Sequence, residues 1–276
     1  MTVTGDTRLF ALLGDPVSHS MSPAMHNAAF RAAGIDAVYI ALRCSRSDAG
    51  ALVRALARAG GGGNVTIPHK GEAARSLDVA SPAVIATDAC NTFWYENGRV
   101  MGDNTDVDGF VAAANALVGT LHGISALVIG AGGAASAVVH GLGQAGADRI
   151  AVANRTHARA EALVARRTVR AARAIRAADI ADGAFDLVIN ATPVGLRVND
   201  ALPLNLAQVR RVGAVLDLVC AAGVTPFVAQ ALELGVPAAD GRTMLLHQGA
   251  AAFEKWLGVP APLDVMRDAI GAAGAG

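Results

Sequence analysis

Short apolar runs alternate with amphipathic segments along the whole of this 276-residue chain. Apolar runs that stop at glycine, proline or polar residues are typical of buried strands, and apolar positions three and four apart are typical of helices. We expect strands at residues 9–13, 37–42, 64–67, 92–95, 100–102, 126–129, 149–153, 187–190 and 214–218. Because helical segments separate most of these strands, the pattern predicts an α/β fold with parallel sheets and right-handed crossovers.

Helix signals stand between the strands. Ser22 can cap the free amide groups of a helix and Pro23 suits the first helical position, so we expect a helix there that stops at Gly34. Pro68 is expected to begin another helix, with Lys70 in its first turn. Further helices are expected at residues 48–59, 107–118, 136–144 and 244–257, and a charged one runs from His157 through Arg167.

Glycine-rich segments mark the expected connections. The glycines at 60–63 are expected to lead into the strand at 64–67. Asn97-Gly98 is a strong turn dipeptide and predicts a hairpin between the strands around it. The low-complexity tail at 271–276 is expected to fray.

Composition and charge exclude several classes of partner. Lys plus Arg and Asp plus Glu are 23 each, so the net charge is zero and long-range attraction to nucleic acid or an anionic membrane is absent. No apolar run approaches the ~18 residues of a spanning helix, and the first residues lack the apolar core of a signal peptide. Three scattered cysteines indicate reduced thiols in a cytoplasmic protein, and the seven histidines show no metal-ligand spacing.

The turn after the strand at 126–129 indicates a dinucleotide site. In a strand–glycine turn–helix unit, Gly130 makes the tight turn, Gly132 lets the backbone approach a pyrophosphate, and Ala135 permits close packing of the helix. The free amide groups at the helix start then face the anion. The expected cofactor contacts of this turn are Gly130, Ala131, Gly132, Gly133 and Ala134. A plain packing turn is the bland alternative.

The end of the next strand favours NADP over NAD. NAD enzymes usually place an acid there for the ribose 2′-hydroxyl, whereas this chain has Asn154-Arg155-Thr156, with Arg159 one helical turn later. Two guanidinium groups attract a 2′-phosphate, and no acid comes before Glu161. We therefore expect NADP as the cofactor. The alternative is that both arginines are ordinary surface charges.

The first half of the chain carries acid–base residues. Lys70 sits in the first turn of its helix, where the helix dipole disfavours a cation, and Asp106 follows a later strand. Lysine beside aspartate at strand ends is suited to proton transfer at a substrate oxygen. Ser20 and Ser22 stand just before a helix start, which suits a small carboxylate. Alternatively, Ser22 is only an N-cap and Ser20 a turn residue.

The order of these motifs resembles that of the shikimate dehydrogenase family. The motifs are SHSMSP at 18–23, NVTIPHK at 64–70, CNT at 90–92, GDNTD at 102–106, GAGGA at 130–134, NRT at 154–156 and NATP at 190–193. NVTIPHK followed by GDNTD is highly specific for that family, and the resemblance runs from Leu9 to Leu257. It implies a two-domain enzyme that reduces 3-dehydroshikimate to shikimate with NADPH, in chorismate and aromatic amino-acid biosynthesis.

The resemblance also implies roles for individual residues. Lys70 and Asp106 would be the catalytic pair, and Ser20 and Ser22 would hold the substrate carboxylate. The substrate hydroxyls would be bound by Thr66, Asn91 and Gln248. Three residues join the expected cofactor contacts: Thr192, Leu218 and Gly241.

The implied organisation is a substrate-binding and catalytic domain at 1–107, completed by helices within 244–276, and an NADP-binding Rossmann domain at 108–243 with a parallel sheet. We expect the two to face each other across a cleft. The expected partners are the small-molecule substrate and cofactor, without nucleic acid or membrane, in a monomer or homodimer.

Two departures from the family pattern bear on the substrate. The family often has Asp-x-x-Tyr where this chain has Asp217 to Cys220, so a tyrosine near the substrate is missing. Gly-Leu-Gly-Met is replaced by a segment with Arg242 and Thr243. A quinate/shikimate dehydrogenase of broader specificity is therefore the enzyme alternative. A non-catalytic dinucleotide sensor on the same fold is the alternative from another class.

Overall fold

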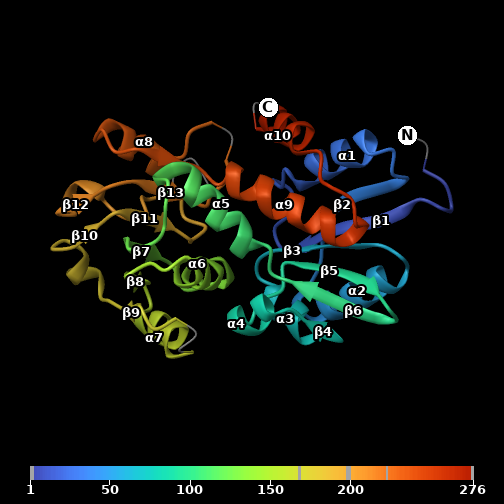
Figure 1. The fold of residues 1–276 in the computed structure, drawn as a ribbon, viewed down its shortest axis with the longest axis horizontal. Helices are drawn as coiled ribbons and strands as arrows, with labels where there is room; N and C mark the ends of the chain where they lie inside the picture. Colours follow the sequence, from blue (N-terminus) through green and yellow to red (C-terminus); the bar gives the residue numbers. More distant parts are fainter. Residues whose placement is uncertain (1–2, 167–168, 197–199, 222, 275–276) are drawn as a thin grey trace. The chain divides into compact units, whose positions relative to one another are not determined.

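The computed structural model describes residues 3–166, 169–196, 200–221 and 223–274. The chain forms two compact units, which are residues 1–109 with 245–276, and residues 110–244. It passes from one unit to the other within helices α5 (Asp106–Val118) and α9 (Arg242–Leu257) (Figure 1).

The first unit is built on a six-stranded mixed sheet with the order β2-β1-β3-β5-β6-β4 (Figure 1). Its strands are β1 (Arg8–Gly14), β2 (Ala37–Arg43), β3 (Gly62–Val65), β4 (Val79–Ala80), β5 (Thr92–Glu96) and β6 (Arg99–Asp103). β1 pairs in parallel with β2 and β3, while β5 is antiparallel to both β3 and β6. The carboxyl ends of β3 and β6 therefore meet the beginning of β5 at one edge of the sheet.

Helices cover both faces of this sheet. They are α1 (Ser22–Ala32), α2 (Arg46–Arg58), α3 (Lys70–Arg75), α4 (Pro82–Thr87), the end of α9, and α10 (Leu263–Ala273), which packs against α1. On one face Leu13 packs in a cluster with Val53 of α2. On the other face Phe10 lies 5.2 Å from Phe30 of α1 and 4.9 Å from Trp256 of α9, measured between ring centroids. Alternate residues of β1 thus face two separate cores.

Two of the glycines expected to precede β3 lie inside the strand. A Cβ atom on Gly62 would come within 2.6 Å of the Phe93 carbonyl oxygen, and one on Gly63 within 2.0 Å of the Ala11 carbonyl oxygen. Neighbouring strands approach too closely there for any side chain. The strand ends at Val65, because the Thr66 carbonyl then accepts a turn hydrogen bond from His69. The prediction of a strand over 64–67 was wrong at both ends.

The hairpin between β5 and β6 is confirmed. Asn97 and Gly98 have φ values of 51° and 79°, as the tight turn of a two-residue hairpin requires.

The second unit contains a six-stranded parallel sheet with the order β14-β13-β11-β7-β8-β9. Its strands are β7 (Ser125–Ile129), β8 (Arg149–Ala153), β9 (Ala172–Ala174), β11 (Leu187–Asn190), β13 (Val215–Asp217) and β14 (Ala238–Ala239). In chain order this is the 3-2-1-4-5-6 arrangement of the Rossmann fold, in which ligands bind at the carboxyl ends of the strands. A short parallel pair joins β10 (Ala184–Phe185) to β12 (Arg211–Val212).

Both faces of this parallel sheet are covered. On one face Val128 clusters with Phe110 of α5 and Val138 of α6. On the other face Leu127 clusters with Phe227 of α8. The helices of the unit are the rest of α5, α6 (Gly133–Gln144), α7 (His157–Ala165), α8 (Pro226–Glu233) and the short 3-10 turns η1 (Ala177–Ile180) and η2 (Leu206–Gln208). The predicted α/β fold with a Rossmann-type domain is confirmed.

Several expected boundaries need correction. α3 begins at Lys70, so Pro68 lies before that helix. α9 begins two residues earlier than expected, at Arg242. α10 continues to Ala273, because it packs on α1, so residues 271–273 of the tail expected to fray are helical. Arg167 and residues 275–276 lie outside the described residues.

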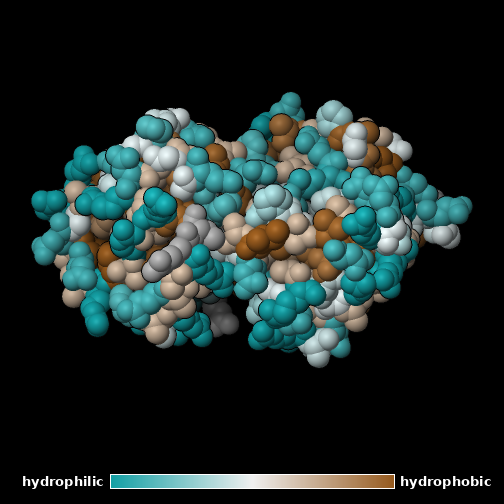
Figure 2. Space-filling view, turned by 60° about the horizontal axis from the view of Figure 1, so that its bottom comes forward, coloured by the Kyte–Doolittle hydropathy of each residue, from teal (hydrophilic) through white to brown (hydrophobic). Residues whose placement is uncertain are grey.

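Hydrophilic residues cover much of the face drawn in Figure 2, where hydrophobic residues appear in scattered groups. Among the described residues, no helix is both long and apolar enough to cross a membrane.

Candidate active site

Lys70 and Asp106 form an ion pair in the first unit. Lys70 begins α3, which follows β3, and Asp106 begins α5, which follows β6. The Lys70 Nζ atom donates to Asp106 Oδ2, and the two side chains are only 14% and 7% exposed. Two residues 36 positions apart meet because the carboxyl ends of β3 and β6 lie at the same edge of the sheet. The pair is largely shielded from water, and opposite charges interact more strongly there than in water.

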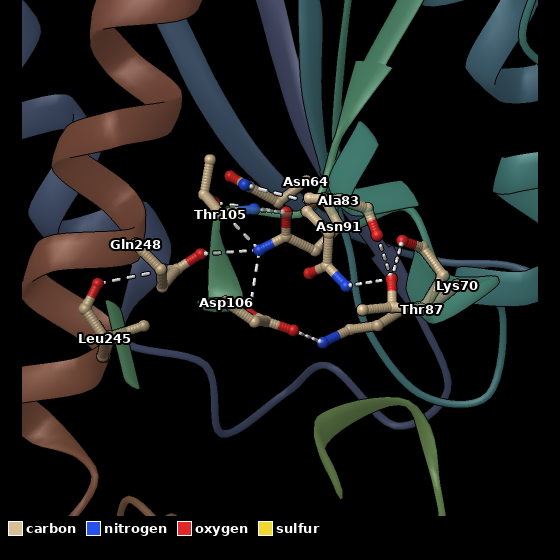
Figure 3. Close-up of polar contacts among 11 residues, drawn as sticks. Asn64, Lys70, Ala83, Thr87, Asn91, Thr105, Asp106, Leu245 and Gln248 are labelled. Carbon is tan, nitrogen blue, oxygen red and sulfur yellow. Dashed lines mark hydrogen bonds and ion pairs between the residues drawn. The ribbon is translucent and has the colours of Figure 1, made fainter. Parts of the chain in front are cut away.

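Asn91 lies beside this pair and joins it to helix α9 (Figure 3). Its side-chain nitrogen donates to Asp106 Oδ1 at 2.8 Å and to Gln248 Oε1 at 3.3 Å. Its side-chain oxygen accepts from the Thr105 amide at 2.8 Å. All of these residues belong to the first unit. Four expected site residues, Lys70, Asn91, Asp106 and Gln248, are thus brought together by direct contacts.

Thr66 lies at the same edge, between β3 and α3. Its backbone amide donates to the Leu13 carbonyl at 2.8 Å, and its carbonyl accepts from His69 at 2.9 Å. These bonds fix the backbone of Thr66 next to the end of β1. Its side chain packs so closely that a Cβ atom on Gly14 would come within 2.3 Å of its methyl group.

Ser20 and Ser22 lie at the start of α1, but not as the N-cap alternative has them. The N-cap of α1 is Met21, Ser22 is the first helical residue, and the helix has no side-chain cap bond. The Ser22 amide instead donates to Ser20 Oγ at 3.2 Å. The alternative that Ser22 is the N-cap is therefore wrong. Ser22 thus belongs to the first turn of the helix, where the free amide groups favour an anion.

A buried anchor around Asp103 was not among the residues predicted from the sequence. Lys255 Nζ lies 2.6 Å from Asp103 Oδ2, and Asp103 Oδ1 accepts from the Ser81 hydroxyl and from the Asn104 amide. Burial opposes ionisation of Asp103, but hydrogen bonds from Lys255 and Ser81 outweigh it and lower the pKa of this carboxyl. This anchor ties α9, which carries Gln248, to the end of β6. Its signal was the first aspartate of GDNTD, which lies three residues before Asp106.

The glycine turn of the second unit has the geometry that a pyrophosphate needs. Gly130 has a φ of 121°, and a Cβ atom there would come within 2.8 Å of the Ala191 carbonyl oxygen. Gly132 is the N-cap of α6, without a side-chain cap bond, and a Cβ atom on it would meet nothing within 4 Å. The amide groups of the first helical turn, which begins at Gly133, thus border open space. Ala131 lies in the same turn, and Ala134 lies in the first turn of α6. These residues fit a dinucleotide phosphate.

The NRT segment follows β8 and leads into α7. The Asn154 side chain donates to the Thr156 carbonyl at 2.9 Å and so shapes the turn. Arg155 and Arg159 are exposed. Neither guanidinium group is in an ion pair with another described residue. Both are therefore available to an anion from solvent.

Thr192, Leu218 and Gly241 lie in loops that follow β11, β13 and β14. Asn190 organises the first two loops, because its side-chain oxygen accepts from the Thr192 hydroxyl at 2.7 Å and its backbone carbonyl accepts from Leu218 at 3.0 Å. Asn190 also donates to the buried carboxylate of Asp217 at 2.8 Å. Burial raises the pKa of Asp217, against the hydrogen bonds from Thr225 and Asn190.

Cys220 and Arg242 lie close together in this unit. Arg242 donates to Asp240 at 2.7 Å and to the carbonyls of Ala221 and Gly223 at 2.8 and 3.2 Å. These bonds hold the loop that contains Cys220, the position where the family often has a tyrosine. Burial raises the pKa of the Cys220 thiol to about 12, so the thiol stays neutral.

Three family models match the chain. A model described as the shikimate dehydrogenase substrate binding domain matches residues 12–93, one described as shikimate / quinate 5-dehydrogenase matches 112–201, and one described as the shikimate 5′-dehydrogenase C-terminal domain matches 241–270. The NADP(+) shikimate dehydrogenase of Citrifermentans bemidjiense is 41% identical and covers 99% of this chain and 97% of its own. That of Geobacter sulfurreducens is 39% identical and covers 99% of both chains. The chain belongs to the shikimate dehydrogenase family, as its motifs indicated.

Solved structures agree. Shikimate dehydrogenase from Aquifex aeolicus matches with a TM-score of 0.89 at 31% identity, over 98% of this chain and 99% of that one. Shikimate 5-dehydrogenase from Thermus thermophilus, in complex with NADP(H) and shikimate, matches with 0.83 at 36% identity, over 96% and 99%. Quinate dehydrogenase from Corynebacterium glutamicum, in complex with NAD, matches with 0.85 at 29% identity, over 96% and 99%.

Proposed function

We propose that this protein catalyses the reversible reduction of 3-dehydroshikimate to shikimate with NADPH, a step of chorismate and aromatic amino-acid biosynthesis. The observation that carries the proposal is the buried Lys70–Asp106 ion pair, with Asn91 and Gln248 in direct contact beside it. A dinucleotide sensor has no use for such an acid–base pair, so its presence favours an enzyme.

We assign the two units separate tasks. The first, residues 1–109 with 245–276, binds the substrate and holds the catalytic pair. Ser20 and Ser22 take the substrate carboxylate at the start of α1, and Thr66, Asn91 and Gln248 take its hydroxyl groups. The second unit binds NADP through the glycine turn, the NRT segment and the loops that carry Thr192, Leu218 and Gly241.

The proposed chemistry is proton transfer by Lys70 at the substrate oxygen. NADPH, when bound, supplies the hydride that reaches the carbonyl carbon. Lys70 donates a proton to the carbonyl oxygen as negative charge develops on it, and accepts that proton in the reverse direction. Asp106 holds the ammonium group through the ion pair, and Asn91 holds the other oxygen of Asp106. Both interactions hold the Lys70 ammonium group in one position.

The alternative is a quinate/shikimate dehydrogenase of broader specificity. Cys220 stands where the family often has a tyrosine, and a relative from Corynebacterium glutamicum is a quinate dehydrogenase in complex with NAD. We place the protein in the cytoplasm. We expect a monomer or homodimer, and light scattering on the purified protein would test this oligomeric state.

Initial rates with shikimate and quinate, each against NADP and NAD, distinguish these functions. We expect the highest kcat/KM with shikimate and NADP. Equal or higher kcat/KM with quinate would favour the alternative. If a folded protein that still binds NADP shows no turnover in any of the four combinations, the non-catalytic dinucleotide sensor is the function that remains.

A further inference from the structure

Tyr39 is a buried tyrosine of β2 that is held at both ends. Its backbone carbonyl accepts from the Asn27 side chain at 2.8 Å, and its backbone amide donates to the Asn27 side-chain oxygen at 2.9 Å. Its ring lies 4.5 Å from that of His26 on α1 and is stacked on it. Since only 1% of Tyr39 is exposed, these contacts leave the hydroxyl little freedom to move.

Asn64 is the one hydrogen-bond partner recorded for the Tyr39 hydroxyl among the described residues. The hydroxyl donates to Asn64 Oδ1 at 2.8 Å. The Asn64 side-chain nitrogen donates to the Asn91 carbonyl at 3.2 Å, which fixes the amide with its oxygen toward the tyrosine. Asn64 is 4% exposed, so water does not replace the tyrosine easily if that hydroxyl is lost.

Asn91 links this chain of bonds to the catalytic pair. Its carbonyl accepts from Asn64 and from the Val65 amide, while its side chain contacts Asp106 and Gln248 (Figure 3). A shift of the Asn91 backbone would therefore displace a side chain that touches two groups of the proposed substrate site.

We infer that Tyr39 is a positioning residue of the substrate site, which acts through Asn64 to hold Asn91 in place. The inference rests on the proposed function, because it assumes that Asn91 binds a substrate hydroxyl. Tyr39 does not touch the substrate, and it joins α1, which carries Ser22, to the strand edge that carries Asn91. Hydrogen-bond networks of this kind hold binding groups in productive geometry.

Tyr39→Phe tests the inference, because it removes one oxygen and keeps the ring stack. We expect the KM for shikimate to rise about five- to tenfold, with kcat within about twofold and the KM for NADP unchanged. The matched control is Tyr95→Phe, since Tyr95 is the only other tyrosine and is 41% exposed on β5. If both variants have the same KM for shikimate, the inference is wrong, whatever happens to thermal stability.

A double-mutant cycle tests the route through Asn64. In an Asn64→Leu background, Tyr39→Phe should cause no further rise in KM, because the hydroxyl has lost the side-chain oxygen through which it acts on Asn91. Effects that multiply would show that Tyr39 acts elsewhere. Should Tyr39→Phe fail to fold, Asn64→Leu carries the first test, with the same expected rise in KM and an unchanged KM overturning the inference.

Lys70→Ala, measured in parallel, distinguishes failure of the positioning role of Tyr39 from failure of the proposed catalytic site. If it lowers kcat while Tyr39→Phe behaves like its control, only the positioning role fails. If Lys70→Ala retains normal kcat, the proposed catalytic site itself fails.

Discussion

The substrate region of the first unit and the cofactor region of the second are built in opposite ways. In the first, Lys70, Asn91, Asp106 and Gln248 are bonded to one another and mostly buried. In the second, the predicted contacts are backbone amides beside open space and the exposed side chains of Arg155 and Arg159.

The difference follows from what each region has to do. Proton transfer requires a lysine and its partner held in one geometry, so the residues fix each other before any ligand arrives. Binding of a phosphate requires only donors that a charged ligand can reach, which a helix start and surface arginines already offer. Substitutions in the first region should therefore impair turnover or shikimate binding, and those in the second should impair cofactor affinity.

The largest expected effect is that of Lys70→Ala. Without the proton donor, kcat should fall by roughly 10²-fold or more, the usual scale for a lost general acid or base. Substrate binding should change much less, because Asn91 and Gln248 remain. Steady-state kinetics measures both quantities, and a near-normal kcat would remove Lys70 from the mechanism.

Arg155→Asp should sharpen the comparison from the other unit. Loss of one charge-assisted hydrogen-bond pair, worth about 1.5–3 kcal/mol, should lower the affinity for NADP about tenfold or more. The affinity for NAD should be unchanged or higher. Arg210→Asp, the same change of charge at another exposed arginine of that unit, is the control. If the KM for NADP does not rise above the control, the 2′-phosphate is held elsewhere, with Arg159 the next residue to change.

Ser20→Ala and Ser22→Ala should each weaken the binding of shikimate by about 1–2 kcal/mol, the scale of one hydrogen bond to an anion. The helix amide groups remain, so the double variant should still bind weakly. KM for shikimate is the readout, with KM for NADP as the internal control. A lower melting temperature with both KM values unchanged would mean that these serines only stabilise the helix start.

A further expected effect is on acid stability of the first unit and not on turnover or binding. Burial lowers the pKa of His26 to about 3, and neither ring nitrogen has a hydrogen-bond partner among the described residues. Because the unfolded chain takes up that proton below its ordinary pKa of about 6.5 and the folded chain does not, the free energy of unfolding should fall as pH drops from 6.5 toward 3. One proton gives at most about 1.4 kcal/mol per pH unit.

His26→Phe should remove that contribution and flatten the pH dependence, since a phenyl ring keeps the contacts with Tyr39 and Trp256. Urea unfolding at pH 5 and pH 8 measures it. An unchanged difference between the two pH values would show that His26 does not titrate on unfolding.

The sequence predicted the long elements well, because their apolar periodicity is strong. It missed α4, α8 and α10 and the short strands at sheet edges, such as β9. These elements are short or depend on tertiary packing, as α10 depends on α1. Gly62 and Gly63 were placed outside β3, because nothing in the sequence shows how closely the neighbouring strands approach.

For the site, motifs located the residues but not their bonds. The chain order placed Lys70 and Asp106 at strand ends, where parallel geometry brings them together. The contacts that support them come from residues far away in sequence, such as Lys255 on Asp103 and Tyr39 on Asn64. Single-sequence patterns carry no information on such long-range pairs.

A crossed binding measurement tests the division of tasks most directly. Isothermal titration of shikimate and of NADP, each into the Ser20→Ala/Ser22→Ala double variant and into Arg155→Asp, gives four Kd values to compare with the unchanged protein. We expect the serine variant to lose affinity for shikimate only and the arginine variant to lose affinity for NADP only. Loss of shikimate affinity in Arg155→Asp, or of NADP affinity in the serine variant, would contradict the account.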